Sequence, residues 1–290
     1  MSISQSFFDL IDQIQPTTSQ VNSAKQHLST IQTRLKSVFE LSSCRVTGSF
    51  SRGSSISGFS DVDLVAVFRK AQFTRAGSII SSNQVLDNVR RQLLARYPNT
   101  PLGRDGMAIT ISFSSGQIVD VVPALFDSMY EQKWPIYLIP DGNGDWMHSS
   151  PSLYDAYICQ SNKKSGGKLK YVTQLIKFWR ECRNPRIPLS SFHIEMVLAS
   201  EGICTIGKTY ADCLYDLLRS IAERDCRPIR DPYRISGNIS AVKTANQLER
   251  ASNSVSHSRD HAYLALVAES DRIAEARRQW NIVFNGYFPH

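Results

Sequence analysis

Residues 48–65 read GSFSRGSSISGFSDVDLV. The first part is too rich in glycine and serine to pack as a regular element, yet apolar strands are expected on both sides of it. Backbone N–H groups and hydroxyls in such a turn can surround phosphate oxygens, and a helix expected to start near Arg52 would add its positive end. Gly48, Ser49, Arg52 and Ser54 are therefore candidate nucleotide contacts, although such a turn is equally consistent with a purely structural role.

Two acidic residues, Asp61 and Asp63, stand at the start of the following strand. Residues two apart on a strand point to the same face, which would bring both carboxylates within reach of one metal pair. The alternate positions are apolar and should face the core, leaving the acids on the cleft side; they are Val62, Leu64, Ala66 and Phe68. An Asp-x-Asp pair alone is more often a solvated strand face.

A third carboxylate, Asp120, lies within the apolar run IVDVV at 118–122. A charge among β-branched residues is costly unless a metal ion, a basic group or the backbone compensates it. Three carboxylates supply the oxygen-only ligand set that Mg²⁺ prefers. We therefore predict that Asp61, Asp63 and Asp120 are the catalytic residues and hold the metal.

The periodicity of the chain predicts a sheet with helical cover, followed by a helical half. Strands are predicted at 44–47, 62–68, 107–113, 117–124 and 134–139. Helices are predicted near 7–14, at 17–40 after a Thr17–Gln20 capping box, and at 79–97, 168–181, 190–201, 209–224, 239–252 and 260–280. We expect an α+β fold with a cleft between its lobes. N-terminal helices (1–40) would pack across the lobes, before a catalytic core (41–150) and a helical substrate-binding lobe (151–290).

This constellation resembles the nucleotidyltransferase superfamily of polymerase β-like enzymes. Within it, the chain is similar to the cGAS/DncV-like nucleotidyltransferases (CD-NTases). These are the cyclic-oligonucleotide synthases of bacterial anti-phage (CBASS) signalling, related to animal cyclic GMP–AMP synthase and oligoadenylate synthase. The resemblance covers most of residues 40–290. It implies a polymerase β-like core, nucleoside triphosphate substrates, two Mg²⁺ ions (for which Mn²⁺ can substitute), release of pyrophosphate, and a cyclic di- or trinucleotide that a separate effector protein reads.

The same resemblance suggests further nucleotide contacts. In KLKYVTQLIKFWR at 168–180, Lys170 is matched to a lysine that neutralises the triphosphate. In PLSSFHIE at 188–195, Ser191 is matched to a phosphate-binding serine and Phe192 to an aromatic ring that stacks on a base. The segment WMHSSP at 146–151 resembles one that reads a base edge, through Ser149 and Ser150.

Each of these matches has a plainer alternative. Lys168, Lys170 and Lys177 fit the solvated face of an amphipathic helix equally well. Phe192 is also consistent with a core position. His193 and Glu195 have no metal-ligand spacing and are interpreted as structural.

Composition limits the class of protein. The 290 residues carry a net charge of +7, which suits a polyanionic ligand, whether nucleic acid or nucleotide. We recognise no secretory signal and no membrane-span-length segment, so a cytoplasmic protein, expected to be a monomer, is predicted. The six cysteines form no CxxC pair and are interpreted as reduced thiols. Residues 161–167 lack the His and Cys residues of the animal synthase's zinc insertion, so nucleic-acid binding is not required.

Two other functions share parts of this pattern. A template-independent RNA or tRNA end-adding enzyme, or one that modifies a small molecule or protein, would use the same acidic core on a different acceptor. An RNA-tailing enzyme usually has an added RNA-binding domain, which we do not expect here. A non-catalytic nucleotide sensor belongs to another class, but it would be expected to lose acidic residues that this chain keeps.

Overall fold

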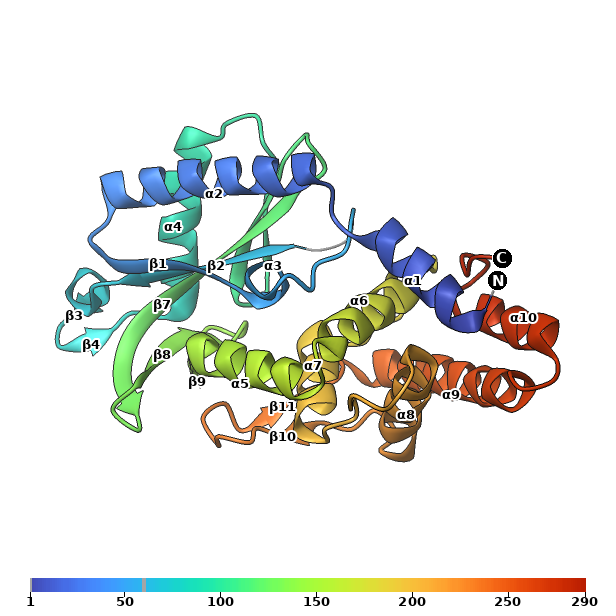
Figure 1. The fold of residues 1–290 in the computed structure, drawn as a ribbon. Coiled ribbons are helices and arrows are strands. Elements are labelled where there is room, and N and C mark those ends of the chain that lie inside the picture. The colour runs from blue at the N-terminus through green and yellow to red at the C-terminus, as the bar shows by residue number, and fades with distance from the viewer. Residues whose placement is uncertain (1, 59–60) are drawn as a thin grey trace. The chain divides into compact units, whose positions relative to one another are not determined.

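The computed structural model describes residues 2–58 and 61–290, so Phe59 and Ser60 of the segment 48–65 lie outside the described residues. The chain forms two compact units, and most of their elements are labelled in Figure 1. The sheet unit comprises residues 16–156, and the helical unit comprises residues 1–15 and 157–290. The first helix therefore belongs with the C-terminal helices and the second with the sheet.

The sheet unit contains a seven-stranded mixed sheet with the strand path β1-β2-β7-β6-β5, in which β8 pairs with β7 and β9 with β8. Strands β2 and β7 run parallel, and the other pairs are antiparallel. The strands are β1 (Leu41–Thr47), β2 (Val62–Phe68), β5 (Leu102–Asp105), β6 (Ala108–Ser112), β7 (Ile118–Tyr130), β8 (Trp134–Pro140) and β9 (Trp146–Ser149). The unit also has α2 (Thr18–Val38), α3 (Gly48–Arg52), η1 (Lys70–Phe73), β3 (Thr74–Arg75), β4 (Ser78–Ile79) and α4 (Ser82–Arg96).

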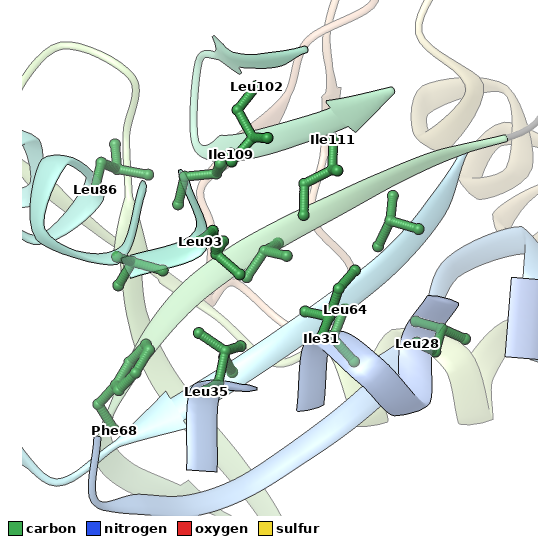
Figure 2. Packing of buried hydrophobic residues seen from close by; sticks show 14 of the residues in the cluster. Leu28, Ile31, Leu35, Leu64, Phe68, Leu86, Leu93, Leu102, Ile109 and Ile111 are labelled. Carbon is green, nitrogen blue, oxygen red and sulfur yellow. The ribbon is translucent and has the colours of Figure 1, made fainter. Parts of the chain in front are cut away.

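The two faces of this sheet bury different residues. One face packs against α2 and α4, and Figure 2 shows Leu64 and Phe68 of β2 in this cluster with Ile31 and Leu35 of α2. All four predicted core positions of β2 belong to it, which confirms the predicted strand facing. The opposite face has a smaller cluster drawn from the alternate positions, namely Val65, Val67, Ala108, Val122, Ala124 and Ile139. The sheet therefore has a buried apolar cluster on each of its faces.

Local capping fixes where the two long helices of this unit begin. The Thr17 hydroxyl accepts from the Gln20 backbone N–H at 3.2 Å, and the Gln20 side chain accepts from the Thr17 N–H at 2.9 Å. This confirms the predicted capping box. Ser81 and Gln84 form a second box at the start of α4. Each box satisfies backbone donors that a helix start would otherwise leave unpaired.

The helical unit buries an aromatic core. Phe7 of α1 lies edge-on to Trp280 and Phe288, with ring centroids 5.0 and 4.9 Å away, and Phe284 stacks on Phe288. Its elements are α1 (Ile3–Ile14), α6 (Lys168–Glu181), α7 (Ser191–Ser200), α8 (Tyr210–Glu223), β10 (Ile229–Arg230), β11 (Asn238–Ile239), α9 (Ala245–Ala268) and α10 (Ile273–Val283). The chain passes from one unit to the other between residues 15 and 16, and again within α5 (Pro151–Lys164).

Three predicted elements were wrong in extent. The strand expected at 117–124 continues to Tyr130, because the hairpin with β8 extends its pairing. The helices expected at 239–252 and 260–280 are instead α9, unbroken from Ala245 to Ala268, and the shorter α10. Serine, asparagine and histidine residues between 252 and 260 interrupt the apolar periodicity by which a helix is predicted, so the sequence did not indicate that α9 is continuous.

Within residues 2–58 and 61–290, no helix combines the length and the apolar character needed to cross a membrane. All six cysteines are free thiols, of which Cys159 is exposed. Burial raises the pKa of Cys44, Cys182 and Cys226 to about 11.

Candidate active site

Four polar residues form one row across the sheet. Asp63 of β2 is paired in register with Asp120 of β7. Thr47 of β1 lies beside Asp63, and Thr110 of β6 lies beside Asp120. Registered neighbours share a face of the sheet, so the two aspartates lie side by side on the face opposite α2 and α4. Both are half-buried, whereas Asp61, one residue before β2, is exposed.

The chemistry of these aspartates suits a hard cation, because carboxylate oxygens are the ligands that Mg²⁺ prefers. Across the described ranges, no group of three or more His, Cys, Asp or Glu side chains is arranged so that it could hold a metal ion. Asp61 directly follows the undescribed pair 59–60. The metal-binding role of Asp61, Asp63 and Asp120 therefore stays a prediction.

Gly48 brings the backbone of the glycine-serine turn against Asp63. Its φ is +72°, and a Cβ added there would collide with the Asp63 carboxylate. Only glycine combines this conformation with so close an approach. The helix α3 begins at Gly48 and ends at Arg52, with Gly53 in the left-handed conformation as its C-cap. The prediction that a helix starts near Arg52 was therefore wrong, because the helix ends there. A helix of five residues is too short to show a periodicity in the sequence.

Asp155 of α5 contacts both ends of α3, the first part of this turn. Its Oδ2 accepts from the Thr47 hydroxyl at 2.8 Å and from the Ser51 hydroxyl at 3.4 Å, and its Oδ1 pairs with the Arg52 guanidinium. The Arg52 side chain is only 8% exposed. Asp155 could not be found from the sequence, because no local pattern around it indicates a contact with a turn about a hundred residues earlier in the chain.

The serines proposed as nucleotide contacts have different environments. Ser49 and Ser54 are buried in the turn, where the Ser54 N–H donates to the Ser49 carbonyl at 2.9 Å. The Ser54 hydroxyl is buried without a hydrogen-bond partner within the described part of the chain. Ser149 is the buried last residue of β9, and the buried Ser150 donates its hydroxyl to the Pro135 carbonyl at 2.8 Å. The Ser150 hydroxyl thus supports the sheet unit itself.

The other candidate contacts belong to the helical unit. Lys170 is half-buried, with its Nζ 5.0 Å from the centroid of the Tyr171 ring. The Ser191 hydroxyl accepts from Arg180 Nη1 at 2.5 Å. Phe192 is 36% exposed, so the alternative that it is a core residue was wrong.

Two other lysines of α6 have internal partners. Lys177 Nζ lies 2.6 Å from Glu195 Oε1, and their side chains are 6% and 2% exposed. Lys168 Nζ donates to the carbonyls of Thr205 and Ile206 at 3.0 Å. The solvated-face alternative was therefore wrong for Lys177, whose charge forms a buried ion pair between α6 and α7. Sequence spacing could not show this pair, because its members come from different helices.

The chain matches a known class of enzyme at the level of family, relatives and fold. The family model of the Second Messenger Oligonucleotide or Dinucleotide Synthetase (SMODS) domain matches residues 1–162. A probable cyclic nucleotide synthase of Bacillus cereus is 24% identical over 273 residues, covering 83% of this chain and 81% of that protein. A cyclic AMP-AMP-AMP synthase of an Acinetobacter species is 26% identical over 193 residues, covering 62% of this chain and 52% of that protein.

Solved structures share the fold over nearly the whole chain. Escherichia coli CdnC with ATP has a TM-score of 0.77 at 17% identity, covering 99% of this chain and 98% of that chain. Bradyrhizobium diazoefficiens CdnG with GTP has a TM-score of 0.72 at 14% identity, covering 98% and 99%. These structures show that the chain has the CD-NTase fold. The family match and the curated relatives show that it is a nucleotidyltransferase. It belongs to the SMODS family.

Proposed function

We propose that this protein joins nucleoside triphosphates into a cyclic di- or trinucleotide second messenger, with release of pyrophosphate, in antiviral defence signalling. The observation that carries the proposal is the pairing of Asp63 with Asp120 across two parallel strands, with Gly48 against Asp63. The names of its relatives support a cyclic product, and the ATP and GTP bound to structural neighbours support triphosphate substrates. A separate effector protein would read the product.

The carboxylates of Asp61, Asp63 and Asp120 would hold two Mg²⁺ ions, which when bound neutralise phosphate charge and lower the pKa of the attacking hydroxyl. The protein's own contribution is to orient the substrates. A ribose hydroxyl of one nucleotide attacks the α-phosphorus of another, and its proton is released to solvent. The bond between the α-phosphorus and the pyrophosphate leaving group breaks. A second transfer within the linear product closes the ring.

The remaining candidates keep the nucleotide contacts predicted from the sequence. In the sheet unit, Ser49 and the Ser54 hydroxyl would contact phosphate oxygens. In the helical unit, the role proposed for Lys170 is to neutralise triphosphate charge. The exposed ring of Phe192 would stack on a base. Arg180, which donates to the Ser191 hydroxyl, would orient that hydroxyl toward a phosphate.

The test is incubation of the purified protein with each NTP and with NTP mixtures, with Mg²⁺ or Mn²⁺, followed by phosphatase treatment and mass spectrometry. We expect a phosphatase-resistant product without free termini, preceded by a linear 5′-triphosphate intermediate. Products that only lengthen as linear chains would instead identify an end-adding enzyme. No nucleotide product with any NTP would contradict the proposal.

Asp63→Asn and Asp120→Asn should each lower turnover by about a thousandfold or more, because each removes a charge from the reacting centre while keeping the shape of the side chain. Asp87→Asn is the matched control, because Asp87 is exposed on α4 and pairs only at the surface with Arg104 at 3.2 Å. Initial rates and thermal unfolding of the three variants provide the measurement. Full activity of a folded Asp63→Asn protein would contradict the assignment.

A further inference from the structure

One carboxylate, that of Asp155, joins the beginning and the end of α3, the part of the turn that begins beside Asp63. It accepts from Thr47, the last residue of β1, and from Ser51 at the end of α3, and it pairs with Arg52. Thr47 is itself the register neighbour of Asp63. Asp155 therefore fixes the position of the turn relative to the proposed reacting centre.

We propose that Asp155 is a positioning residue for the proposed nucleotidyl transfer, and that Arg52 is its structural partner rather than a phosphate ligand. This inference rests on the proposed function, because it concerns how the turn is presented to a triphosphate. It replaces the sequence-based assignment of Arg52 as a nucleotide contact.

The burial of the ion pair supports this division of roles. The Arg52 side chain is 8% exposed and that of Asp155 is 20% exposed, so both charges have lost most of their hydration. Moving the Arg52 guanidinium to a phosphate would leave the Asp155 charge without its cation in this setting, which is strongly unfavourable. The Thr47 and Ser51 hydrogen bonds add directional contacts that a mobile phosphate-binding arginine would not need.

Gly48 couples the position of the turn to that of the Asp63 carboxylate in the proposed reacting centre. Because its backbone passes so close to the Asp63 carboxylate, a displaced turn would either collide with Asp63 or move away from it. Losing Asp155 should therefore disturb the phosphate end of the substrate site and leave base recognition intact. A general loss of folding would weaken both phosphate binding and base recognition.

The two possible roles of Arg52 give opposite results for Asp155→Asn. If Asp155 positions the turn, the variant binds triphosphate more weakly. If Arg52 is instead a phosphate ligand restrained by Asp155, the variant frees the Arg52 guanidinium and binds triphosphate more tightly. The sign of the change decides between them.

The experiment is calorimetric titration of non-hydrolysable ATP and GTP analogues, and of adenosine and guanosine, in Mg²⁺ buffer. The proteins are the parent, Asp155→Asn, Thr47→Val and Ser152→Ala. Thr47→Val keeps the shape of the side chain, so it tests the inference even if Asp155→Asn fails to fold. Ser152→Ala is the matched control, because Ser152 lies on the same turn of α5 as Asp155 and its hydroxyl accepts from Arg45 of β1 at 2.7 Å.

We expect Asp155→Asn to weaken triphosphate binding about ten- to a hundredfold, as loss of hydrogen bonds to a charged group typically does. Thr47→Val should weaken it by a smaller factor, and nucleoside affinity and the control should be unchanged. Unchanged or tighter triphosphate binding by folded Asp155→Asn or Thr47→Val would overturn this inference and leave the proposed function standing. A parent protein that binds no triphosphate would overturn the proposed function and this inference with it.

Discussion

At Gly48, the absence of a side chain lets the backbone approach a carboxylate that the proposed chemistry needs. Two separate constraints act there: a φ of +72° and the collision that a Cβ would make with Asp63. The positive φ alone would lower the free energy of unfolding by about 1–2 kcal/mol for a residue other than glycine. The second would displace either the turn or the carboxylate, so it should affect activity more than stability.

Gly48→Ala should therefore lower turnover at least about tenfold, because repositioning a reacting group by a fraction of an ångström is costly to catalysis. Gly116→Ala is the matched control, since Gly116 has a φ of +80° but nothing within 4 Å of an added Cβ. Both variants should lose similar unfolding free energy in urea titrations, and only Gly48→Ala should lose activity in NTP assays. Equal activity of the two variants would show that the close approach to Asp63 has no functional role.

Among the elements, α9 shows how packing forms a helix that the hydrophobic pattern does not reveal. Its buried positions follow one helical stripe, but small or polar residues occupy most of them: Ala251, Val255, Ser258, Ala262, Ala265 and Ala268. Small side chains allow close approach of neighbouring helices while adding little hydrophobic signal. At Ser258 the stripe contains a buried hydroxyl that accepts from Trp179 Nε1 of α6 at 2.8 Å.

Ser258→Ala should destabilise the protein by about 1–3 kcal/mol, because it leaves the indole N–H of the fully buried Trp179 without its acceptor. Ser254→Ala, on the same helix, removes only a bond to the Arg250 carbonyl and should cost less than about 0.5 kcal/mol. Urea unfolding followed by tryptophan fluorescence measures both. An equal effect of the two variants would mean that the Trp179–Ser258 bond does not stabilise the helical unit.

For the molecule as a whole, stability should depend on pH through a buried histidine. His193 of α7 is 1% exposed, and its Nε2 donates to the Arg227 carbonyl at 3.2 Å. Burial lowers its pKa below 6.5, an effect that the Arg227 carbonyl opposes and the nearby Arg224 charge adds to. The unfolded chain therefore binds a proton below pH 6.5 that the folded chain binds less readily.

It follows that the free energy of unfolding should fall as the pH drops below 6.5 toward the lowered pKa. For one proton the slope is at most about 1.4 kcal/mol per pH unit. His193→Gln, which can keep a donor to the Arg227 carbonyl, should flatten this dependence. Urea titrations between pH 7.5 and pH 5 provide the measurement. An unaltered slope in His193→Gln would assign the acid sensitivity to other groups.

The sequence by itself determined the class of fold, the order of most elements and the facing of β2. These features depend on local patterns: two-residue alternation, helical spacing and the Thr17–Gln20 cap. It also grouped Asp61, Asp63 and Asp120 as candidate metal ligands, because a carboxylate inside an apolar strand needs compensation. The tertiary structure alone decided the pairing of Asp63 with Asp120 in register and the continuity of α9. It also decided that Asp155 is the partner of Arg52 and Glu195 that of Lys177. These contacts join residues far apart in the chain, and the burial that makes them necessary exists only once the two units have folded.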